Sequence, residues 1–441
     1  MPLAIQSNPH QRPQRHRWVL IILQVALLVA LSLAAPSHAQ TTNLPDELPN
    51  ARDYLNRIQQ GIERIREQLP EITNAANLIA DDLVERDLYL GVMGSDGLAA
   101  ELSHRPGALT LVSGEPGRTG EPVIYIFGVR KTSDPPLAEH LRNQVDEAQR
   151  LRGSGVLIGI APFKTLEQHN LLEPAQEAVD VLIDNDGHDQ PHGAPTLTVL
   201  NTIAAWTLQA ELFAACTRRD KVPVVVISDE LDRLQRHSSR YAGQRFMHDR
   251  WLEPIPPQTL GDAYLTETSK VLRNIGTASW HTLSAAARRA GRSLADGGSI
   301  FVLPGGRQPP RHLGNQLADD PNALRSFNNA RPGQRDMVIA FGEHHPPNDP
   351  WWGEQGRYRS AGRGVVWVIA SYGQSHKQLR PGDAIIDTWG PVGDAVVRIE
   401  PLDLSLGPVS AVTTETIAWM LSAQIPAEAD YLLSRRLDRR P

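Results

Sequence analysis

A tryptophan-centred octapeptide occurs twice in this sequence, and the repetition limits what the chain can fold into. AWTLQAEL begins at residue 205 and AWMLSAQI at residue 418, with Ala, Trp, Leu and Ala at the same offsets. The chain has 441 residues, which is enough for about two to three domains. The octapeptides, whose tryptophans are Trp206 and Trp419, therefore predict two copies of one structural unit.

Other segments recur in the same order in both halves. Tyr54 and Tyr264 each stand about 40 residues before a glycine that follows a short apolar run, LYLGVMG in one case and SIFVLPG in the other. Between tyrosine and run, apolar residues spaced by three and four predict helices. The runs that follow are PVIYIFG and DMVIAFG, then GVLIGIA and GVVWVIA, then VDVLID and GDAIID. Each copy thus predicts two helices, a series of strands and a closing tryptophan helix.

The predicted strands are apolar along their whole length. Strands of this kind are buried on both faces, as in a parallel sheet covered by helices on each side. We therefore predict an α/β protein of two tandem three-layer αβα domains, each with a mainly parallel sheet of about five strands. The predicted domains are residues 51–230 and 263–425, and the linker at 231–262 contains the proline-rich stretch WLEPIPPQTLGD.

The N-terminal segment differs from the rest of the chain. Three arginines precede an apolar run over residues 18–35, and the small residues Ser37 and Ala39 occupy the two positions that a signal peptidase reads. This pattern predicts a signal peptide over residues 1–39 and an exported body, periplasmic or secreted, that begins at Gln40. An uncleaved membrane anchor is the alternative, because the run is close to the length of a spanning helix.

Charge and cysteine content narrow the function classes. Without the three arginines of the signal peptide, 41 basic residues stand against 50 acidic ones, a net charge of −9. Nucleic acid binding requires a basic surface, so we expect no nucleic acid partner. Cys216 is the only cysteine and stands among apolar residues in ELFAACTRR, which favours a buried side chain over a nucleophile.

The order of these segments resembles the sugar isomerase (SIS) phosphosugar-binding family, arranged in tandem as in the isomerase half of glucosamine-6-phosphate synthase. The second copy carries most of the resemblance, in AAARRAGRSLADGGSIFVLPGG and GDAIIDTWGPVGDAVVRIEPLDLSLGPVSAVTTETIAWML. The first copy adds VDVLIDNDG and CTRRDKVPVVVISDE. The resemblance covers roughly residues 50–425. It implies a sugar phosphate at the carboxyl ends of the strands, where helix N-termini also favour anions.

The resemblance also implies two phosphate-binding loops, one after the first strand and one after the second. In the first copy these loops supply glycines, hydroxyls and positive charge from Gly94, Ser95, Asp96, Gly97, Arg130, Lys131, Thr132 and Ser133. In the second copy GGRQPPRH and GEHHPPNDP carry prolines, which lack an N–H donor. We therefore expect the ligand in the first copy. The alternative is a solvated loop in which Ser133 or Asp134 caps the next helix.

Two further groups of side chains suit a ligand. Imidazole and carboxylate ligands bind zinc, but the candidates are divided between the copies: His188, His192 and Asp186 in the first, His344 and His345 in the second. We therefore expect no metal and no cofactor. Trp351 and Trp352 could stack on a sugar ring, although tryptophans beside proline and glycine more often cover neighbouring core.

Catalysis is the least determined part of the sequence. Isomerisation of an aldose to a ketose needs a base that moves a proton between neighbouring carbons, and in the resembled family the base is a glutamate. Glu415, after the GPVS turn, is the nearest candidate, although a first-turn glutamate is also an ordinary helix-terminal residue. The first candidate function is binding of a sugar phosphate or carbohydrate derivative, by an active isomerase or by a protein that has lost isomerase activity. The second is an inactive scaffold or interaction protein of the cell envelope. Recognition of an unphosphorylated sugar is the third.

Overall fold

The computed structural model describes residues 48–94, 96–113, 120–128, 136–187, 195–227, 235–304, 324–326, 332–342, 362, 364–370 and 382–437. Residues 48–441 belong to one compact unit. The predicted signal peptide lies outside the described residues.

The first half of the chain alternates strands and helices. Its strands β1 to β4 form one sheet in the order β1-β2-β3-β4, and every neighbouring pair is parallel. Next to β1, Leu90 forms a single parallel bridge with Val112. The elements are α2 (Pro49–Glu67), α3 (Leu69–Arg86), β1 (Gly91–Met93), α4 (Asp96–His104), β2 (Val123–Ile126), α5 (Leu137–Leu151), β3 (Leu157–Ala161), α6 (Phe163–Gln168), α7 (Leu172–Ala178), β4 (Val181–Asp184), α8 (Leu197–Thr217) and α9 (Gln235–Arg240).

The second half contains a second parallel sheet, in the order β6-β5-β7-β8-β9. Strands β10 and β11 form an antiparallel hairpin, which in chain order follows β9 and precedes the last helix. The elements are α10 (Thr259–Thr277), α11 (Trp280–Ala295), β5 (Ile300–Pro304), β6 (Leu324–Ser326), β7 (Met337–Phe341), β8 (Val365–Ile369), β9 (Ala384–Asp387), β10 (Ala395–Ile399), η3 (Glu400–Leu402), β11 (Leu404–Pro408) and α14 (Ser410–Leu437).

The two sheets share one strand order. In the first half the segment after β1 returns to the outer side of that strand through the Leu90–Val112 bridge, and in the second half β6 returns to the outer side of β5. The predicted fold class, two α/β units with parallel sheets and helices, is confirmed. The predicted five strands occur in the second sheet. The first sheet has four within the described residues, because a single bridge occupies its fifth position. The predicted domain bounds stay predictions.

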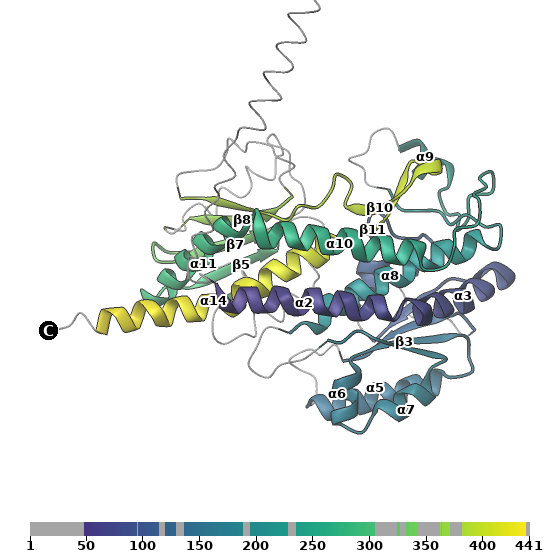
Figure 1. Cartoon of the computed structure of the whole chain (residues 1–441), viewed down its shortest axis with the longest axis horizontal. Coiled ribbons are helices and arrows are strands. Elements are labelled where there is room, and N and C mark those ends of the chain that lie inside the picture. Colours follow the sequence, from purple (N-terminus) through teal and green to yellow (C-terminus); the bar gives the residue numbers. More distant parts are fainter. Residues whose placement is uncertain are drawn as a thin grey trace, which may run out of the picture. The chain divides into compact units, whose positions relative to one another are not determined.

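Both faces of the first sheet are buried, which explains its continuously apolar strands. Along β2, Ile124 and Ile126 join the main core, with side chains from α3 and α8. The alternating Tyr125 and Phe127 join a second core with side chains from α5, α6 and α7. Figure 1 shows these two groups of helices on opposite sides of β3. The main core continues through α10, α11 and α14, so one body of apolar side chains serves both halves.

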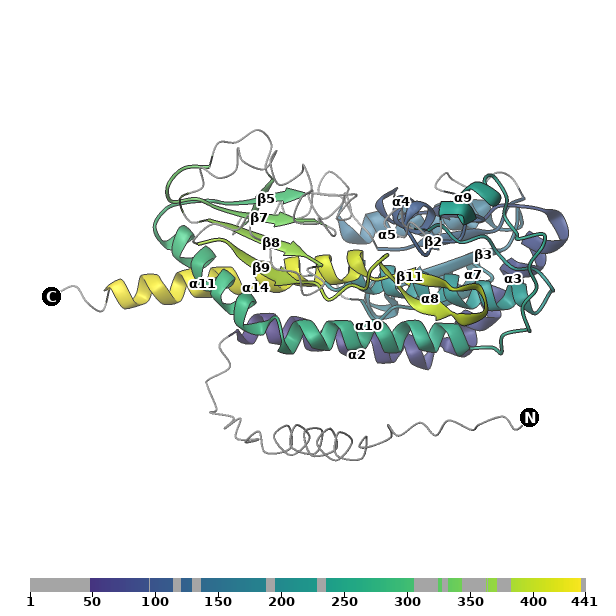
Figure 2. The same cartoon turned by 90° about the horizontal axis from the view of Figure 1, so that it is seen from above.

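Helices α2 and α10 join the two halves. They lie side by side, as Figure 2 shows, and each contacts the tryptophan helix of the other half: α2 contacts α14, and α10 contacts α8. The hydroxyl of Tyr54 donates to the Pro195 carbonyl at 3.0 Å, and that of Tyr264 donates to the Pro408 carbonyl at 3.1 Å. The two prolines precede the tryptophans at equal offsets. The recurring tyrosines thus occupy equivalent positions in the two halves.

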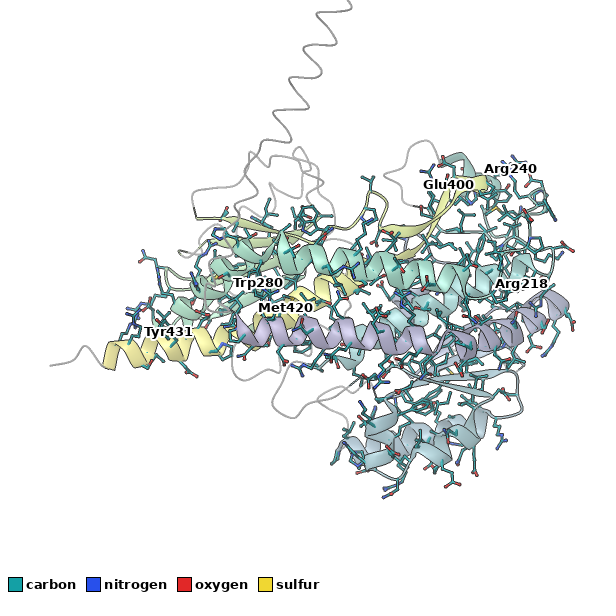
Figure 3. The ribbon with its side chains drawn as sticks, in the orientation of Figure 1. Arg218, Arg240, Trp280, Glu400, Met420 and Tyr431 are labelled. Atoms are coloured by element: carbon teal, nitrogen blue, oxygen red, sulfur yellow. The ribbon has the colours of Figure 1, made fainter. Side chains whose placement is uncertain are left out.

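A cation–π contact also connects the halves. The guanidinium of Arg52, in α2, lies 3.9 Å from the ring centre of Trp280, the first residue of α11. Figure 3 labels this tryptophan, and also Met420 on the neighbouring α14. Contacts of this kind are strongest where water is partly excluded, as it is beside a half-buried ring.

The repeated octapeptide supplies the N-terminal caps of α2 and α10. In α8, the Glu211 carboxylate accepts the N–H groups of Gln258 and Gly261, at the start of α10, both at 2.8 Å. In α14, Oε1 of Gln424 accepts two N–H groups at the start of α2, at 3.1 and 3.4 Å. Glu211 and Gln424 occupy the same position of the octapeptide. Each half therefore satisfies the unpaired N–H groups that begin the first helix of the other half.

Helix α8 is the most deeply buried element. It is long and apolar enough to cross a membrane, and no other helix of the described ranges is, but all of its side chains are buried in protein. A core helix has the same composition, so burial accounts for it. Cys216 is buried in this helix, which confirms the expected buried side chain, and burial raises the pKa of its thiol to about 12.

We expect Glu211→Ala to destabilise the protein by about 2–3 kcal/mol, because hydrogen bonds to a buried charged acceptor contribute roughly 1.5–3 kcal/mol. The Thr73 hydroxyl, which donates to the same carboxylate at 3.0 Å, would also lose its partner. Urea unfolding measures the free energy. The control is Glu67→Ala, which removes an exposed pair with Arg64 and should change stability by no more than about 0.5 kcal/mol. Equal unfolding midpoints for the two variants would contradict the capping role.

Candidate functional site

The predicted ligand loops begin side by side at the carboxyl edge of the first sheet. Gly94 follows β1 with φ of +83°, and Gly128 follows β2 with φ of +86°. A Cβ atom on Gly94 would lie 2.1 Å from the carbonyl oxygen of Ile126, the last residue of β2. Only glycine permits both this backbone conformation and so close an approach. The two strand ends are therefore held in contact by glycine.

A buried glutamine of α5 connects the same two loops. Oε1 of Gln144 accepts the Gly128 N–H at 2.8 Å, while its Nε2 donates to the carbonyl oxygens of Ile126 and Gly94 at 3.4 and 3.5 Å. The side chain of Gln144 is 6% exposed. The sequence analysis missed this residue, because one amide among the charged residues of a helix carries no distinctive signal.

The structure describes only part of the predicted site. Gly94, Asp96 and Gly97 are described, whereas Ser95 and residues 130–133 lie outside the described residues. Helix α4 begins at Asp96, directly after the glycine turn. The positive end of its dipole and its unpaired N–H groups therefore lie at the carboxyl edge of the sheet, where an anion is favoured. The ligand role of these residues stays a prediction.

The first turn of α8 lies at the same edge. A Cβ atom on Gly128 would lie 3.0 Å from the Leu197 side chain, and one on Gly187, after β4, would lie 2.8 Å from that side chain. Leu197 is the first residue of α8. The ends of β2 and β4 thus converge on the start of this helix.

A charged turn follows β4. The Asp184 carboxylate accepts the N–H groups of Phe163 at 3.1 Å and Asp186 at 2.9 Å. Burial raises the pKa of Asp184, although these two hydrogen bonds oppose the shift. The Lys164 ammonium pairs with Asp186 at 2.9 Å. The carboxylates after β4 and the ammonium group of α6 therefore place both signs of charge at this edge.

Two buried asparagines lie behind this turn. Oδ1 of Asn185 accepts the Gly187 N–H at 2.7 Å, and its Nδ2 donates to Oδ1 of Asn201, one turn into α8. Nδ2 of Asn201 is buried and makes no hydrogen bond in the described structure. A buried amide without a partner costs about 1–3 kcal/mol, and native proteins retain few of them without a water or a ligand. Asn201 is itself 1% exposed, so this unpaired amide lies in the core beneath the edge, and nothing in the sequence marks it.

The metal candidates are not brought together within the described residues. Asp186 pairs with Lys164, and the four candidate histidines, His188, His192, His344 and His345, lie outside the described residues, as do Trp351 and Trp352. The part of the chain that the structure describes contains no group of three or more side chains suited to hold a metal ion. The expected absence of a metal stays a prediction.

Glu415 lies at the contact between α8 and α14. It is fully buried, and its carboxylate accepts the Thr198 hydroxyl and, at 3.4 Å, the indole N–H of Trp419. Burial and then the charge of Glu415 raise the pKa of Tyr54, while the Arg57 charge opposes the shift. A catalytic base must reach a substrate carbon, whereas these contacts connect two core helices. The catalytic role of Glu415 is untested.

The second sheet repeats the turn that follows β4, with Thr388 and Trp389 in place of Asn185 and Asp186. Oδ1 of Asp387, at the end of β9, accepts the Trp389 N–H at 2.8 Å, as Oδ1 of Asp184 accepts the Asp186 N–H at 2.9 Å. Asp186 and Trp389 have φ of +48° and +57°. Aspartate adopts this left-handed conformation readily, but for a bulky residue it is unusual and costs on the order of 1–3 kcal/mol.

No protein family model matches the chain. Among curated proteins, it is similar to UPF0309 protein TTE0306 of Caldanaerobacter subterraneus subsp. tengcongensis, with 26% identity over 234 residues, which cover 42% of this chain and 93% of that protein.

Several solved structures are also similar. One is a protein named for sugar binding from Salmonella typhimurium LT2, with 12% identity, a TM-score of 0.44 and coverage of 85% of this chain and 99% of the other. Another is named as a phosphosugar isomerase, from Silicibacter pomeroyi DSS-3, with 12% identity, a TM-score of 0.43 and coverage of 86% and 98%. The C-terminal domain of glucosamine-fructose-6-phosphate aminotransferase from Francisella tularensis has 9% identity, a TM-score of 0.41 and coverage of 84% and 95%. The fold assignment rests on the strand order described above.

We expect Asp184→Asn to change stability in a pH-dependent way. Because burial raises the pKa of this carboxyl above its usual value of 3.8, the folded state holds the proton more tightly than the unfolded state. The contribution of this group to stability is thus complete below the unfolded pKa and is lost as pH rises through the folded pKa. Asparagine does not titrate. The free energy of unfolding of the variant relative to wild type should therefore rise as the pH increases above 3.8, the usual pKa of this group. Urea unfolding at several pH values checks this, and a constant difference would contradict it.

Proposed function

We propose that the protein binds a sugar phosphate or a carbohydrate derivative at the carboxyl edge of the first sheet. One observation carries the proposal: the glycine turns at Gly94 and Gly128 converge there with the N-terminus of α4 and the first turn of α8. A phosphate suits the N–H groups of a glycine turn and a helix N-terminus.

In this proposal the loop that follows Gly128 provides the positive charge. Lys131 acts as the cation, while Ser95, Thr132 and Ser133 donate hydrogen bonds to the phosphate oxygens. The contact that Gln144 makes between Gly94 and Gly128 supports the proposal, because it brings the starts of the two loops together without any ligand.

The alternative function is a scaffold of the cell envelope without catalysis. The burial of Glu415 favours it, since the nearest candidate base is hydrogen-bonded to Thr198 and Trp419 inside the core. Function depends on sites rather than on folds, so a fold of this type can be retained after its chemistry is lost. A protein that only binds a sugar and a protein that only serves as a scaffold are both expected not to isomerise sugar phosphates.

Export is also part of the proposal. Phosphorylated sugars are made and retained in the cytoplasm, so an exported isomerase would lack its usual substrate, which favours binding or assembly over isomerisation. We expect the exported protein to begin at Gln40, because Ser37 and Ala39 fit the signal peptidase. Mass spectrometry of the exported protein checks this, and an intact Met1 end would favour a membrane anchor instead.

Calorimetry with glucosamine 6-phosphate and fructose 6-phosphate tests the site. We expect Lys131→Ala to weaken binding by about ten- to a hundredfold, because a charge-assisted hydrogen bond contributes about 1.5–3 kcal/mol. The control is Lys270→Ala in α10, which removes only an exposed pair with Glu267 and should leave the affinity unchanged. Equal affinities of wild type and Lys131→Ala would place the ligand elsewhere.

Glu415→Gln separates a binder from an isomerase. Glutamine can still accept the Thr198 hydroxyl, so the variant should fold, but it cannot act as a base. We expect neither wild type nor variant to interconvert glucosamine 6-phosphate and fructose 6-phosphate, as followed by NMR. An activity in the wild type that Glu415→Gln abolishes at unchanged thermal stability would identify an isomerase.

A further inference from the structure

We propose that Trp389 forms a second binding site, at the carboxyl edge of the second sheet, on which the ring of a neutral sugar stacks. The proposal is independent of the phosphate site in the first half, because it uses another sheet, another kind of contact and an uncharged ligand.

The position of Trp389 is that of a ligand contact in an open parallel sheet. The residue lies two positions after the end of β9. A Cβ atom on the next residue, Gly390, would lie 3.9 Å from Cβ of Ala370, which directly follows β8. Trp389 thus stands where the carboxyl ends of two neighbouring strands meet, and ligands bind beyond such ends.

The indole ring is held in one orientation while much of its surface stays open. Its Nε1 donates to Oγ of Ser279 at 2.8 Å, and this hydroxyl donates to the Asp387 carbonyl at 2.9 Å. Ser279 is buried, whereas Trp389 is 40% exposed. A ring already fixed by its polar edge loses little freedom when a ligand stacks on it, so the contact favours binding.

The turn at Trp389 has the same backbone conformation as the turn at Asp186, so this turn does not require a tryptophan. The same turn in the first half has Asp186, with the same left-handed conformation and the same hydrogen bond from the residue N–H to the strand-ending aspartate. The short aspartate adopts that conformation readily, and tryptophan does so only under strain. Strained residues persist at ligand sites. An aspartate would satisfy this turn, so the proposal assigns the Nε1 edge of the indole to Ser279 and its exposed face to a ligand.

The surroundings favour a neutral ring over a phosphorylated one. Val392, three residues after Trp389, is 55% exposed, and the Asp387 carboxylate accepts the Trp389 backbone N–H at 2.8 Å. The indole offers an anionic ligand no positive charge and no open N–H donor, because its Nε1 is already bonded to Ser279. A pyranose offers an apolar C–H face to the indole and hydroxyl groups that a carboxylate accepts.

The test measures the binding of maltotetraose, cellotetraose and tetra-N-acetylchitotetraose to the protein without residues 1–39, by calorimetry and tryptophan fluorescence. We expect at least one of the three to bind, and Trp389→Asp, which installs the residue of the first half, to weaken that binding at least tenfold. Ser279→Ala should weaken it by a smaller factor, because the ring loses its anchor. The control is Trp251→Ala: Trp251 is 67% exposed in the extended segment before α10 and should not affect the affinity.

Other results overturn the proposal. These are no binding of any of the three probes to wild type, unchanged binding to Trp389→Asp, or an equal loss in Trp251→Ala. A change of oligomeric state in Trp389→Asp, measured by sedimentation, would identify a protein contact instead. If Trp389→Asp fails to fold, Trp389→Phe keeps a ring without the Ser279 bond and should retain weaker binding, whereas full affinity in Trp389→Phe would rule out the anchored stack. Binding of sugar phosphates and its loss in Lys131→Ala report separately on the first half.

Discussion

The crosswise capping of α2 and α10 is the constraint on which the rest of the structure depends. A helix that begins inside a protein leaves N–H groups without partners, and leaving them so is costly. Here the partners come from the tryptophan helix of the opposite half, through the Glu211 carboxylate and the Gln424 amide. Each capped helix then contacts the tryptophan helix that caps it. The shared core follows, because the same four helices contribute apolar side chains to it.

This arrangement leaves the carboxyl edges of the two sheets to be shaped by local features. In the first half Gly94, Gly128 and Gly187 let the strand ends and the start of α8 approach one another. The Gln144 side chain hydrogen-bonds to the backbone of the first two glycines. In the second half a turn of the same geometry carries an aromatic ring. The core is thus built from what the halves have in common, and the edges differ in charge, polarity and aromatic surface.

The repeat, the strands and the strand-ending residues could be predicted from sequence, because each is a local pattern. The Phe-Gly ends of β2 and β7 and the aspartate ends of β4 and β9 lie where apolar runs stop. The features that the sequence did not reveal depend on contacts between distant residues. Gln144 is distinctive only once Gly94 and Gly128 are adjacent, and Glu211 is a cap only once α10 crosses to α8. The β10–β11 hairpin is not predicted either, because its residues fall within the segment that resembles the SIS pattern. The ligand role of residues 130–133 stays a prediction.

The fusion of two capped halves in one chain has a consequence for divergence. In a symmetric dimer of identical subunits, a substitution at one site appears at both, so the two sites cannot specialise separately. Here Asp186 and Trp389 occupy equivalent turns yet are encoded independently. One edge can therefore change its ligand while the other keeps its own, and selection on the shared caps still holds the two together.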